Sequence, residues 1–423
     1  PLYLVQMNEC SLENIDFLTG CENLEDVELN ENAVTSLLPL SGCANLKTLS
    51  ASSNQITSLE GLEDKTLLCT LQLNNNQISD LTPLTHDTEL DTLELANNNV
   101  SDLTPLSDMT ELTWLELQNN SVSDLRPLAG NERMRYMYLA NNQLTSFDGC
   151  ENMIELKVIR AAHNQIENLD GLVNVTQLED ISLSDNKLTD ISLLAKSAGN
   201  LNVVLIDNND ISDISALAGN PDMELVTMEN NHISDISALA GMSKLKYLSA
   251  YHNEITDITA LGDCKTLYYV DLGENQIADI APLASSVVSQ RMLLLQNNCI
   301  TDISTLYRDT DYVYLSLYGN PIEDYSILRE LTSISFMWDT LIVFWEENMN
   351  IEDIGASPYA AELHFVGAPK DRQAGVARIC RETKEELEIS GYYYKPTFIT
   401  QNEADAKIQK VRQTFREEQK ADR

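Results

Sequence analysis

Three groups of residues in this sequence have the types that could carry chemistry. His364 lies close to Glu362 and Asp371, a combination that could act as an acid–base set. Eight cysteines could bind zinc or form disulfides. Aspartate recurs at steps of 22 or 23 residues, and carboxylates in register could bind calcium. These aspartates are Asp80, Asp102, Asp124, Asp190, Asp213, Asp235, Asp257, Asp279, Asp302 and Asp324.

None of these groups has the pattern that its chemistry requires. The histidine is not accompanied by an HExxH, GxSxG, P-loop or GxGxxG motif. Calcium sites draw several oxygen ligands from one loop, whereas each step here supplies one carboxylate. The cysteines form no CxxC pair; Cys21 and Cys43 are placed for a possible bridge, but two buried thiols are favoured. The sequence therefore predicts no catalytic residues, no metal and no cofactor.

Charge and hydrophobicity exclude further classes of function. The 423 residues carry a net charge of −39, and residues 1–330 hold 15 of the 27 Lys and Arg but 50 of the 66 Asp and Glu. Such a surface repels phosphate backbones and anionic lipids. The apolar run at 341–345 is far too short to span a bilayer. Two explanations of the negative charge remain: it attracts a basic partner, or it serves solubility alone.

The elements that position these residues are repeats. Residues 112–128, LTWLELQNNSVSDLRPL, have apolar residues at positions 1, 4, 6, 11, 14 and 17 and asparagine at position 9. The same template fits fifteen times, with twelve spacings of 22 residues and two of 23. The repeats begin at residues 2, 24, 46, 68, 90, 112, 134, 156, 178, 201, 223, 245, 267, 290 and 312.

Each part of the template has a structural interpretation. The LxxLxL stretch alternates as a short strand does, so stacked repeats predict one parallel sheet. Asparagine fills position 9 in every repeat but the first, which has Cys10, and predicts a ladder that bonds backbone groups inside the coil. The recurring aspartate at position 13 is expected to cap a short helical turn, with Pro83, Pro105, Pro127 and Pro282 just inside it.

The template LxxLxLxxNxIxDIxxL, over residues 2–330, resembles the 22-residue leucine-rich repeat of the internalin family of bacterial surface proteins, and also the phosphatase-regulatory leucine-rich subunits of eukaryotes. The resemblance implies an α/β solenoid of the leucine-rich-repeat horseshoe type, with a parallel concave sheet and short 3₁₀ turns on the convex side. It also implies protein recognition. Because repeat one begins at Leu2 without a helical segment ahead of it, we expect that a cap was removed or that another module precedes it.

Large side chains at the outward strand positions are the candidate partner-binding residues. Tyr, Trp and Arg dominate interface hot spots because they combine apolar area with a polar group, although tyrosine also favours strands for other reasons. The candidates form two groups: Trp114, Tyr136, Tyr138, Arg160 and His163, and then Tyr247, Tyr251, His252, Tyr269, Tyr314 and Tyr318. Asp26, Glu28 and Glu31 form a small acidic patch at the other end.

After residue 330 the period fails, so we expect two domains: a solenoid of fifteen repeats over 1–330 and a small α/β module over 331–423. Strands are expected at 333–337, 341–345, 361–368 and 391–400, and a helix at 370–388. Residues 402–420, with Ile408, Val411 and Phe415 at helical spacing, predict a terminal amphipathic helix that could dock a partner or continue into a linker. The module is expected to cap the last coil.

The sequence favours a protein that is not an enzyme and binds a protein ligand on its concave face, without nucleic acid and without membrane insertion. An extracellular or cell-surface location in a bacterium is the leading expectation. An intracellular scaffold or regulatory subunit in the cytoplasm is the alternative, because oxidising compartments tend to avoid unpaired cysteines or pair them. A second alternative places an enzyme or a separate binding activity in residues 331–423. The sequence does not indicate an oligomeric state.

Overall fold

The computed structural model describes residues 2–285, 288, 291–306, 312–329, 340–344, 349, 351, 362–386 and 396–421. The chain divides into two compact units, Pro1–Asp222 and Met223–Arg423. Each unit is described below by itself. No helix among the described residues is long and apolar enough to cross a membrane.

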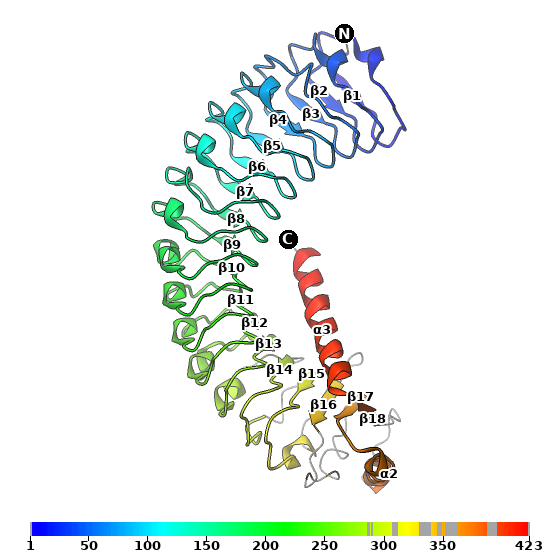
Figure 1. Ribbon diagram of the computed structural model, residues 1–423, viewed down its shortest axis with the longest axis vertical. Helices are drawn as coiled ribbons and strands as arrows, with labels where there is room; N and C mark the ends of the chain where they lie inside the picture. Colours follow the sequence, from blue (N-terminus) through cyan, green and yellow to red (C-terminus); the bar gives the residue numbers. More distant parts are fainter. Residues whose placement is uncertain are drawn as a thin grey trace. The chain divides into compact units, whose positions relative to one another are not determined.

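The first unit is a stack of coils, each contributing one three-residue strand. Within the unit, neighbouring strands from β1 to β10 pair in parallel, as in Leu93 opposite Leu115. The strands line the inner side of the unit in Figure 1. They are β1 (Leu4–Gln6), β2 (Asp26–Glu28), β3 (Thr48–Ser50), β4 (Thr70–Gln72), β5 (Thr92–Glu94), β6 (Trp114–Glu116), β7 (Tyr136–Tyr138), β8 (Val158–Arg160), β9 (Asp180–Ser182) and β10 (Val203–Leu205).

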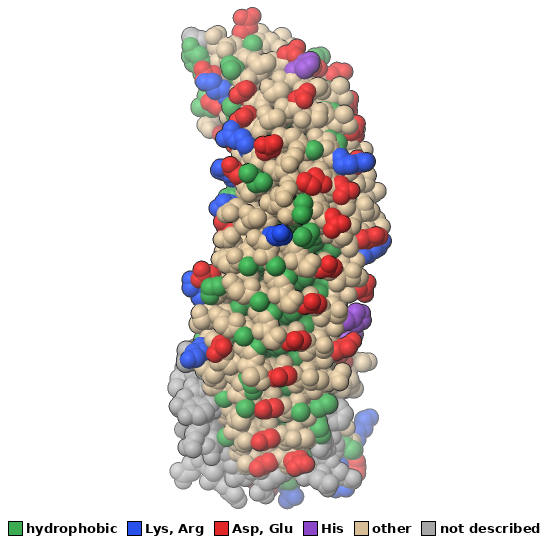
Figure 2. All heavy atoms as spheres, turned by 90° about the vertical axis from the view of Figure 1, so that its left-hand side faces the viewer, with side chains coloured by type: hydrophobic (Ala, Val, Ile, Leu, Met, Phe, Trp, Pro, Cys, Tyr) green, Lys and Arg blue, Asp and Glu red, His purple; other side chains and the backbone are tan. Residues whose placement is uncertain are grey.

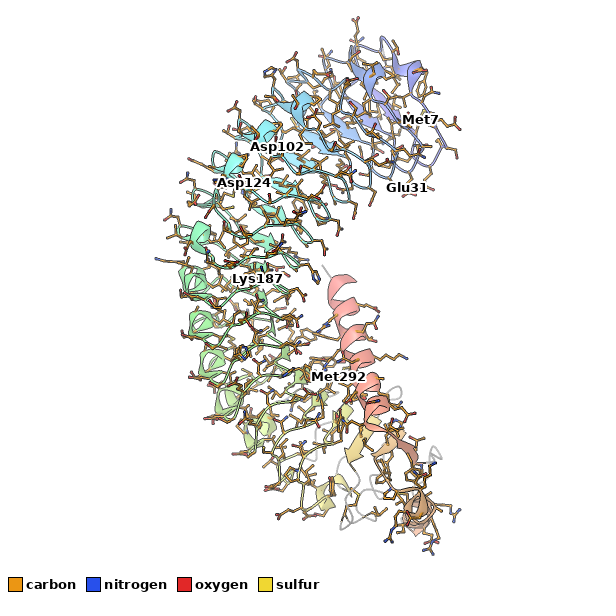
Figure 3. The ribbon with its side chains drawn as sticks, viewed as in Figure 1. Met7, Glu31, Asp102, Asp124, Lys187 and Met292 are labelled. Atoms are coloured by element: carbon orange, nitrogen blue, oxygen red, sulfur yellow. The ribbon has the colours of Figure 1, made fainter. Side chains whose placement is uncertain are left out.

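Short 3₁₀ turns lie on the outer side of each unit, as predicted. In the first unit these are η1 (Asp16–Leu18), η2 (Leu38–Leu40), η3 (Thr82–Leu84), η4 (Thr104–Leu106), η5 (Arg126–Leu128), η6 (Asp170–Leu172), η7 (Ser192–Ser197) and η8 (Ser215–Leu217). The predicted aspartate cap is confirmed: Asp102 Oδ1 accepts the backbone N–H of Thr104 at 2.8 Å, and all ten recurring aspartates make the same contact two residues ahead. Asp102 and Asp124 are labelled on this side in Figure 3, and acidic side chains recur along the outer face in Figure 2.

The predicted asparagine ladder is also confirmed. Asn98 donates from Nδ2 to the carbonyl oxygens of Leu95, Ala96 and, one coil earlier, Leu73, at 3.0 to 3.2 Å. Its Oδ1 accepts the backbone N–H of Ile78, also one coil earlier, at 2.9 Å. One amide thus satisfies backbone groups in two coils that apolar side chains could not satisfy.

The residue before each ladder asparagine adopts the left-handed conformation, with φ between 53° and 58° in Glu31, Asn97, His163, His252 and nine others. Asparagine is frequent there because its side chain tolerates this region. The turn ends the strand and swings the ladder asparagine inward. The leucines on the inward side, such as Leu93 and Leu115, are fully buried.

The second unit continues the strands and 3₁₀ turns of the repeats and then adds two α-helices near its C-terminal end. Its strands are β11 (Leu225–Thr227), β12 (Tyr247–Ser249), β13 (Tyr269–Asp271), β14 (Arg291–Leu294), β15 (Tyr312–Ser316), β16 (Thr340–Phe344), β17 (Glu362–Val366) and β18 (Thr397–Ile399), with 3₁₀ turns η9 (Ser237–Leu239), η10 (Thr259–Asp263), η11 (Ala281–Ser285) and η12 (Ser326–Arg329). Parallel pairing runs unbroken from β11 to β18. Helices α2 (Lys370–Glu386) and α3 (Gln401–Ala421) complete it.

The expected C-terminal module is thus present as strands and helices near the expected positions. The predicted strand at 333–337 lies outside the described residues. Strands β16 to β18 extend the parallel sheet of the repeats. The domain boundary at residues 330 and 331 stays a prediction.

One buried position of the repeats departs from the apolar core. The residue three positions before a new repeat is buried and apolar in several coils, as in Cys43 and Met109, but in the fourth repeat Asp87 fills this position and is fully buried. Neither carboxylate oxygen of Asp87 has a hydrogen-bond partner among the described residues. Burial raises the pKa of Asp87 to about 7, although Lys65 partly opposes this shift.

We expect Asp87→Asn to stabilise the protein in a pH-dependent way. The folded state holds the proton up to pH 7, so this group favours folding below about pH 4 and loses that contribution as the pH rises to 7. The substitution should therefore raise the free energy of unfolding at pH 8, by up to about 4 kcal/mol, and change it little at pH 4. The amide at the same position two repeats later, Asn131, already donates to the Met109 carbonyl.

Denaturant unfolding at pH 4 and pH 8 measures this effect. Asp64→Asn is the matched control, because Asp64 carries the same charge in the corresponding loop of the preceding repeat but is exposed and pairs with His86 at 2.9 Å. An equal gain at both pH values, or the same gain from Asp64→Asn, would contradict the explanation.

Candidate functional site

Four of the five residues in the first candidate group form a continuous cluster on β6, β7 and β8. The Trp114 ring lies 4.9 Å from the Tyr136 ring and 5.1 Å from the Tyr138 ring, between centroids. The Arg160 guanidinium lies 5.8 Å from the centre of the Tyr138 ring and pairs with Asp180 at 2.7 Å. All four candidate side chains are half-buried. We call these four residues the Trp114 cluster.

Carboxylates border the Trp114 cluster. The indole N–H of Trp114 donates to Glu116 Oε1 at 3.0 Å. Asn74 Nδ2 lies 2.9 Å from Glu94 and 3.4 Å from Glu116, so the two carboxylates share one amide. Burial, and then the neighbouring Glu116, raise the pKa of Glu94, while the side chains of Gln72 and Asn74 oppose the shift. The face therefore offers aromatic surface beside negative charge.

The second group of candidate residues lies beneath helix α3. The helix begins with a reciprocal cap: the Thr400 N–H donates to Glu403 Oε2 at 2.7 Å, and the Glu403 N–H to the Thr400 hydroxyl at 3.3 Å. Its buried residues, Ala404, Ile408, Arg412 and Phe415, recur at helical spacing. In Figure 1 the helix runs along the inner, strand-bearing side of this unit, and Figure 3 labels Met292 of β14 beside it.

An aromatic stack holds the middle of this contact. Phe415 lies parallel to the Tyr269 ring, with centroids 4.0 Å apart and 8° between planes, and 5.3 Å from the Tyr247 ring. Tyr269 is fully buried, and burial first, then Asp271 and Glu229, raise its pKa well above its usual value. Offset or parallel aromatic pairs add about 0.5–1.5 kcal/mol beyond the area they bury.

Ion pairs surround the stack. Arg412 donates to both carboxylate oxygens of Asp271, at 2.5 and 3.2 Å, and both side chains are almost fully buried. The Arg412 guanidinium also lies 3.5 Å from the centre of the Tyr251 ring. Burial, together with Glu274, raises the pKa of Tyr251 to about 12. Further along, Arg416 pairs with buried Glu229 at 2.5 Å.

The same contact continues toward the start of the helix, where the Tyr318 hydroxyl donates to Asp405. Tyr314 and Tyr318 are buried.

The two candidate histidines, His163 and His252, are exposed and lie in the left-handed turns after their strands. His163 faces the carboxylate of Asp185 at 3.3 Å, and His252 faces that of Glu274 at 4.0 Å.

The two candidate groups thus differ: the first is a half-exposed cluster, and tyrosines of the second contact the chain's own helix. The amphipathic pattern predicted α3 but not its position, since it was expected in a module that caps the last coil. Sequence reasoning missed Asp271, Glu229, Arg412 and Arg416. For Asp271 the available signal was an acidic residue at a strand position that holds Thr227 and Ser249 in the two preceding repeats.

The residues first considered for chemistry have structural contacts. His364 is buried on β17, and its Nδ1 hydrogen-bonds the Thr397 hydroxyl on β18. Over the described part of the chain, no group of three or more His, Cys, Asp or Glu could hold a metal ion. All eight cysteines are free, and Cys43 Sγ contacts the Cys21 carbonyl rather than its sulfur.

We expect Arg412→Ala to weaken the docking of α3 by about 3–5 kcal/mol, because it leaves the Asp271 carboxylate buried without its charged partner. Removing both charges in Arg412→Ala/Asp271→Ala should cost less than Arg412→Ala alone. Hydrogen exchange of the α3 amides measures docking directly. Lys410→Ala is the control, since Lys410 has the same charge on the exposed side of the same helix. If Lys410→Ala accelerates exchange as much, the ion pair does not hold the helix.

Comparison with known proteins agrees with this architecture. Residues 44–86 and 243–285 match the family model of Leucine Rich repeats (2 copies). No curated protein sequence matches the chain significantly. Among solved structures, the functional domain of InlJ from Listeria monocytogenes is 23% identical, with a TM-score of 0.62, and the match covers 77% of this chain and 70% of that one. The plant peptide hormone receptor RGFR1 in complex with RGF2 is 16% identical, with a TM-score of 0.64, and the match covers 94% of this chain and 68% of that one. Both similarities show the fold alone.

A crystal structure of the internalin InlF from Listeria monocytogenes is more similar in sequence. It is 35% identical, with a TM-score of 0.61, and the match covers 63% of this chain and 79% of that one. Together with the fifteen repeats, the asparagine ladder and the parallel sheet, this similarity shows that the chain belongs to the internalin-like family of leucine-rich-repeat proteins.

Proposed function

We propose that this chain is a non-enzymatic recognition protein, and that the strand face bearing the Trp114 cluster binds a segment of another protein. The observation that carries the proposal is the contact made by α3. Tyr269 and Asp271, at the third and fifth positions of their repeat, hold Phe415 and Arg412. Trp114 and Glu116 occupy the same two positions of their own repeat, so the same kind of surface is built twice.

This equivalence indicates the chemistry of the partner. A half-exposed aromatic surface favours an aromatic or aliphatic side chain, and the adjoining Glu94 and Glu116 favour Lys or Arg. The surface is built on short strands held by the ladder, so little of it has to become ordered on binding. The comparison with RGFR1 in complex with RGF2 shows that a protein of this fold binds a peptide hormone. Nucleic acid remains disfavoured by the charge of −39.

The location forms part of the proposal. The family relationship favours an extracellular or cell-surface protein in a bacterium, whereas the free cysteines favour the cytoplasm as the alternative. Immunoblots of culture medium and of intact cells treated with protease distinguish the two. Protein that stays inside protease-resistant cells would support the intracellular scaffold.

We expect Trp114→Ala/Tyr138→Ala to weaken binding to a protein ligand at least 30-fold, because each truncated hot-spot residue typically costs about 2 kcal/mol or more. The ligand is first captured with the intact chain and identified, and its affinity is then measured with purified proteins. Glu94→Gln/Glu116→Gln should weaken binding less and reduce its dependence on salt.

The matched control is Ile154→Ala, which truncates an apolar side chain that is 56% exposed but lies outside the strands. It should leave binding unchanged. Unaltered affinity in the Trp114→Ala/Tyr138→Ala variant would show that this face is not the binding surface, provided that circular dichroism shows the variant folded.

A further inference from the structure

The surface beneath α3 is built on the outward side of the strands. We call the surface formed by Tyr247, Tyr251, Tyr269, Asp271 and Glu229 the helix-binding surface. On the opposite side of the same strands, Leu248, Val270 and Leu293 are fully buried in the core of the coils. The helix therefore covers the face that solenoids use for ligands, and it does not fill the core.

The coils under the helix satisfy their own backbone without it. Asn253 donates to the carbonyls of Met228, Ala250 and Tyr251, and its Oδ1 accepts the N–H of Ile233. Asn275 repeats the pattern with Ala250, Leu272 and Gly273. No ladder bond of these two asparagines involves α3.

The acidic groups of the helix-binding surface are also held by the strands. Ser249 Oγ donates to Glu229 Oε1 at 2.7 Å, and the Gly273 N–H donates to Asp271 Oδ1 at 3.1 Å. Both carboxylates are therefore oriented by the coils themselves. Their second oxygens, Asp271 Oδ2 and Glu229 Oε2, accept from Arg412 and Arg416, each at 2.5 Å. A surface with fixed carboxylates needs a basic partner.

The composition of the contact is that of a recognition interface. Replacing a buried ion pair by apolar residues of similar volume is often neutral or stabilising, so such pairs add little net stability. Aromatic and arginine side chains at the centre of a contact instead dominate binding energy and discriminate between partners. In α3 these groups stand at positions 412, 415 and 416, which place them on one face of the helix.

We propose that the helix-binding surface is a second recognition site, which takes a basic amphipathic helix of another protein with the pattern Arg-x-x-Phe-Arg, and that α3 occupies this site as an intramolecular competitor. Because α3 is tethered, its effective concentration is of the order of millimolar, and a partner helix must displace it. The proposal does not depend on the Trp114 cluster, which lies on other strands.

The test uses a fluorescent peptide of residues 400–421 as the probe and the full-length chain as the receptor. In the loosened chain, Arg412→Ala/Phe415→Ala, the internal helix has lost its two central contacts. We expect fluorescence anisotropy to show at least tenfold tighter binding of the peptide to the loosened chain than to the unmodified chain. Adding Tyr247→Ala/Asp271→Ala to the loosened chain should weaken peptide binding at least tenfold.

Two controls define the specificity. A peptide with Arg412→Glu/Arg416→Glu should not bind, because its charges oppose Asp271 and Glu229. Trp114→Ala in the loosened chain should leave peptide binding unchanged, which separates this site from the proposed function of the Trp114 cluster.

Several results would overturn the proposal. Equal binding of the peptide by the unmodified and loosened chains would show that α3 does not compete for the surface. No binding by the folded loosened chain would show that the surface is not a site for a free helix. Unfolding of the repeats in the loosened chain, detected by circular dichroism, would make α3 a structural element. A dimer of the unmodified chain with exchanged helices, detected by sedimentation, would make a second copy the occupant.

Discussion

The side-chain amide of the ladder asparagine is the interaction on which the other features depend. Asn98 satisfies three carbonyls and one N–H across two coils, and the left-handed residue before it, Asn97, turns the backbone so that the amide points inward. Each neutral hydrogen bond contributes only about 1 kcal/mol net, but an unpaired buried carbonyl costs about 1–3 kcal/mol. The amide therefore stabilises the closure of each coil that carries it, and that closure positions the strand before it.

Because closure and core packing use the inward positions, the outward strand positions are not constrained by the core. Unit one places Trp114 and Glu116 there, and unit two places Tyr269 and Asp271. Both pairs combine an aromatic ring with a carboxylate held by a neighbouring donor. Such pairs have no part in the ladder, so they can change from repeat to repeat without disturbing the fold. This separation lets one scaffold present two outward surfaces of different composition.

The sequence predicted those features whose interacting residues lie within one or two repeats of each other. The ladder at Asn98, the cap at Asp102 and the strand at Trp114 follow from residue type and spacing, since their partners lie within about one period. Arg412 and Asp271 are separated by 141 residues, and no periodicity connects them. Asp87 was missed because it lies at position 20 of its repeat, beyond the 17-residue template, so the pattern gave no indication of its burial.

The tyrosines of the second unit show why exposure cannot be inferred from strand position alone. Tyr269 has the outward position and the side chain of a hot-spot residue, yet Phe415 covers its ring completely. In this structure the Tyr269 ring stacks on Phe415 of the chain's own helix, and its use in binding another protein stays a prediction. Strand position could not identify the occupant, because the amphipathic pattern of residues 402–420 fits a partner surface in the same chain as well as one in another protein. The contact in unit two therefore supplies what sequence patterns lack, which is the identity of the group that covers this ring.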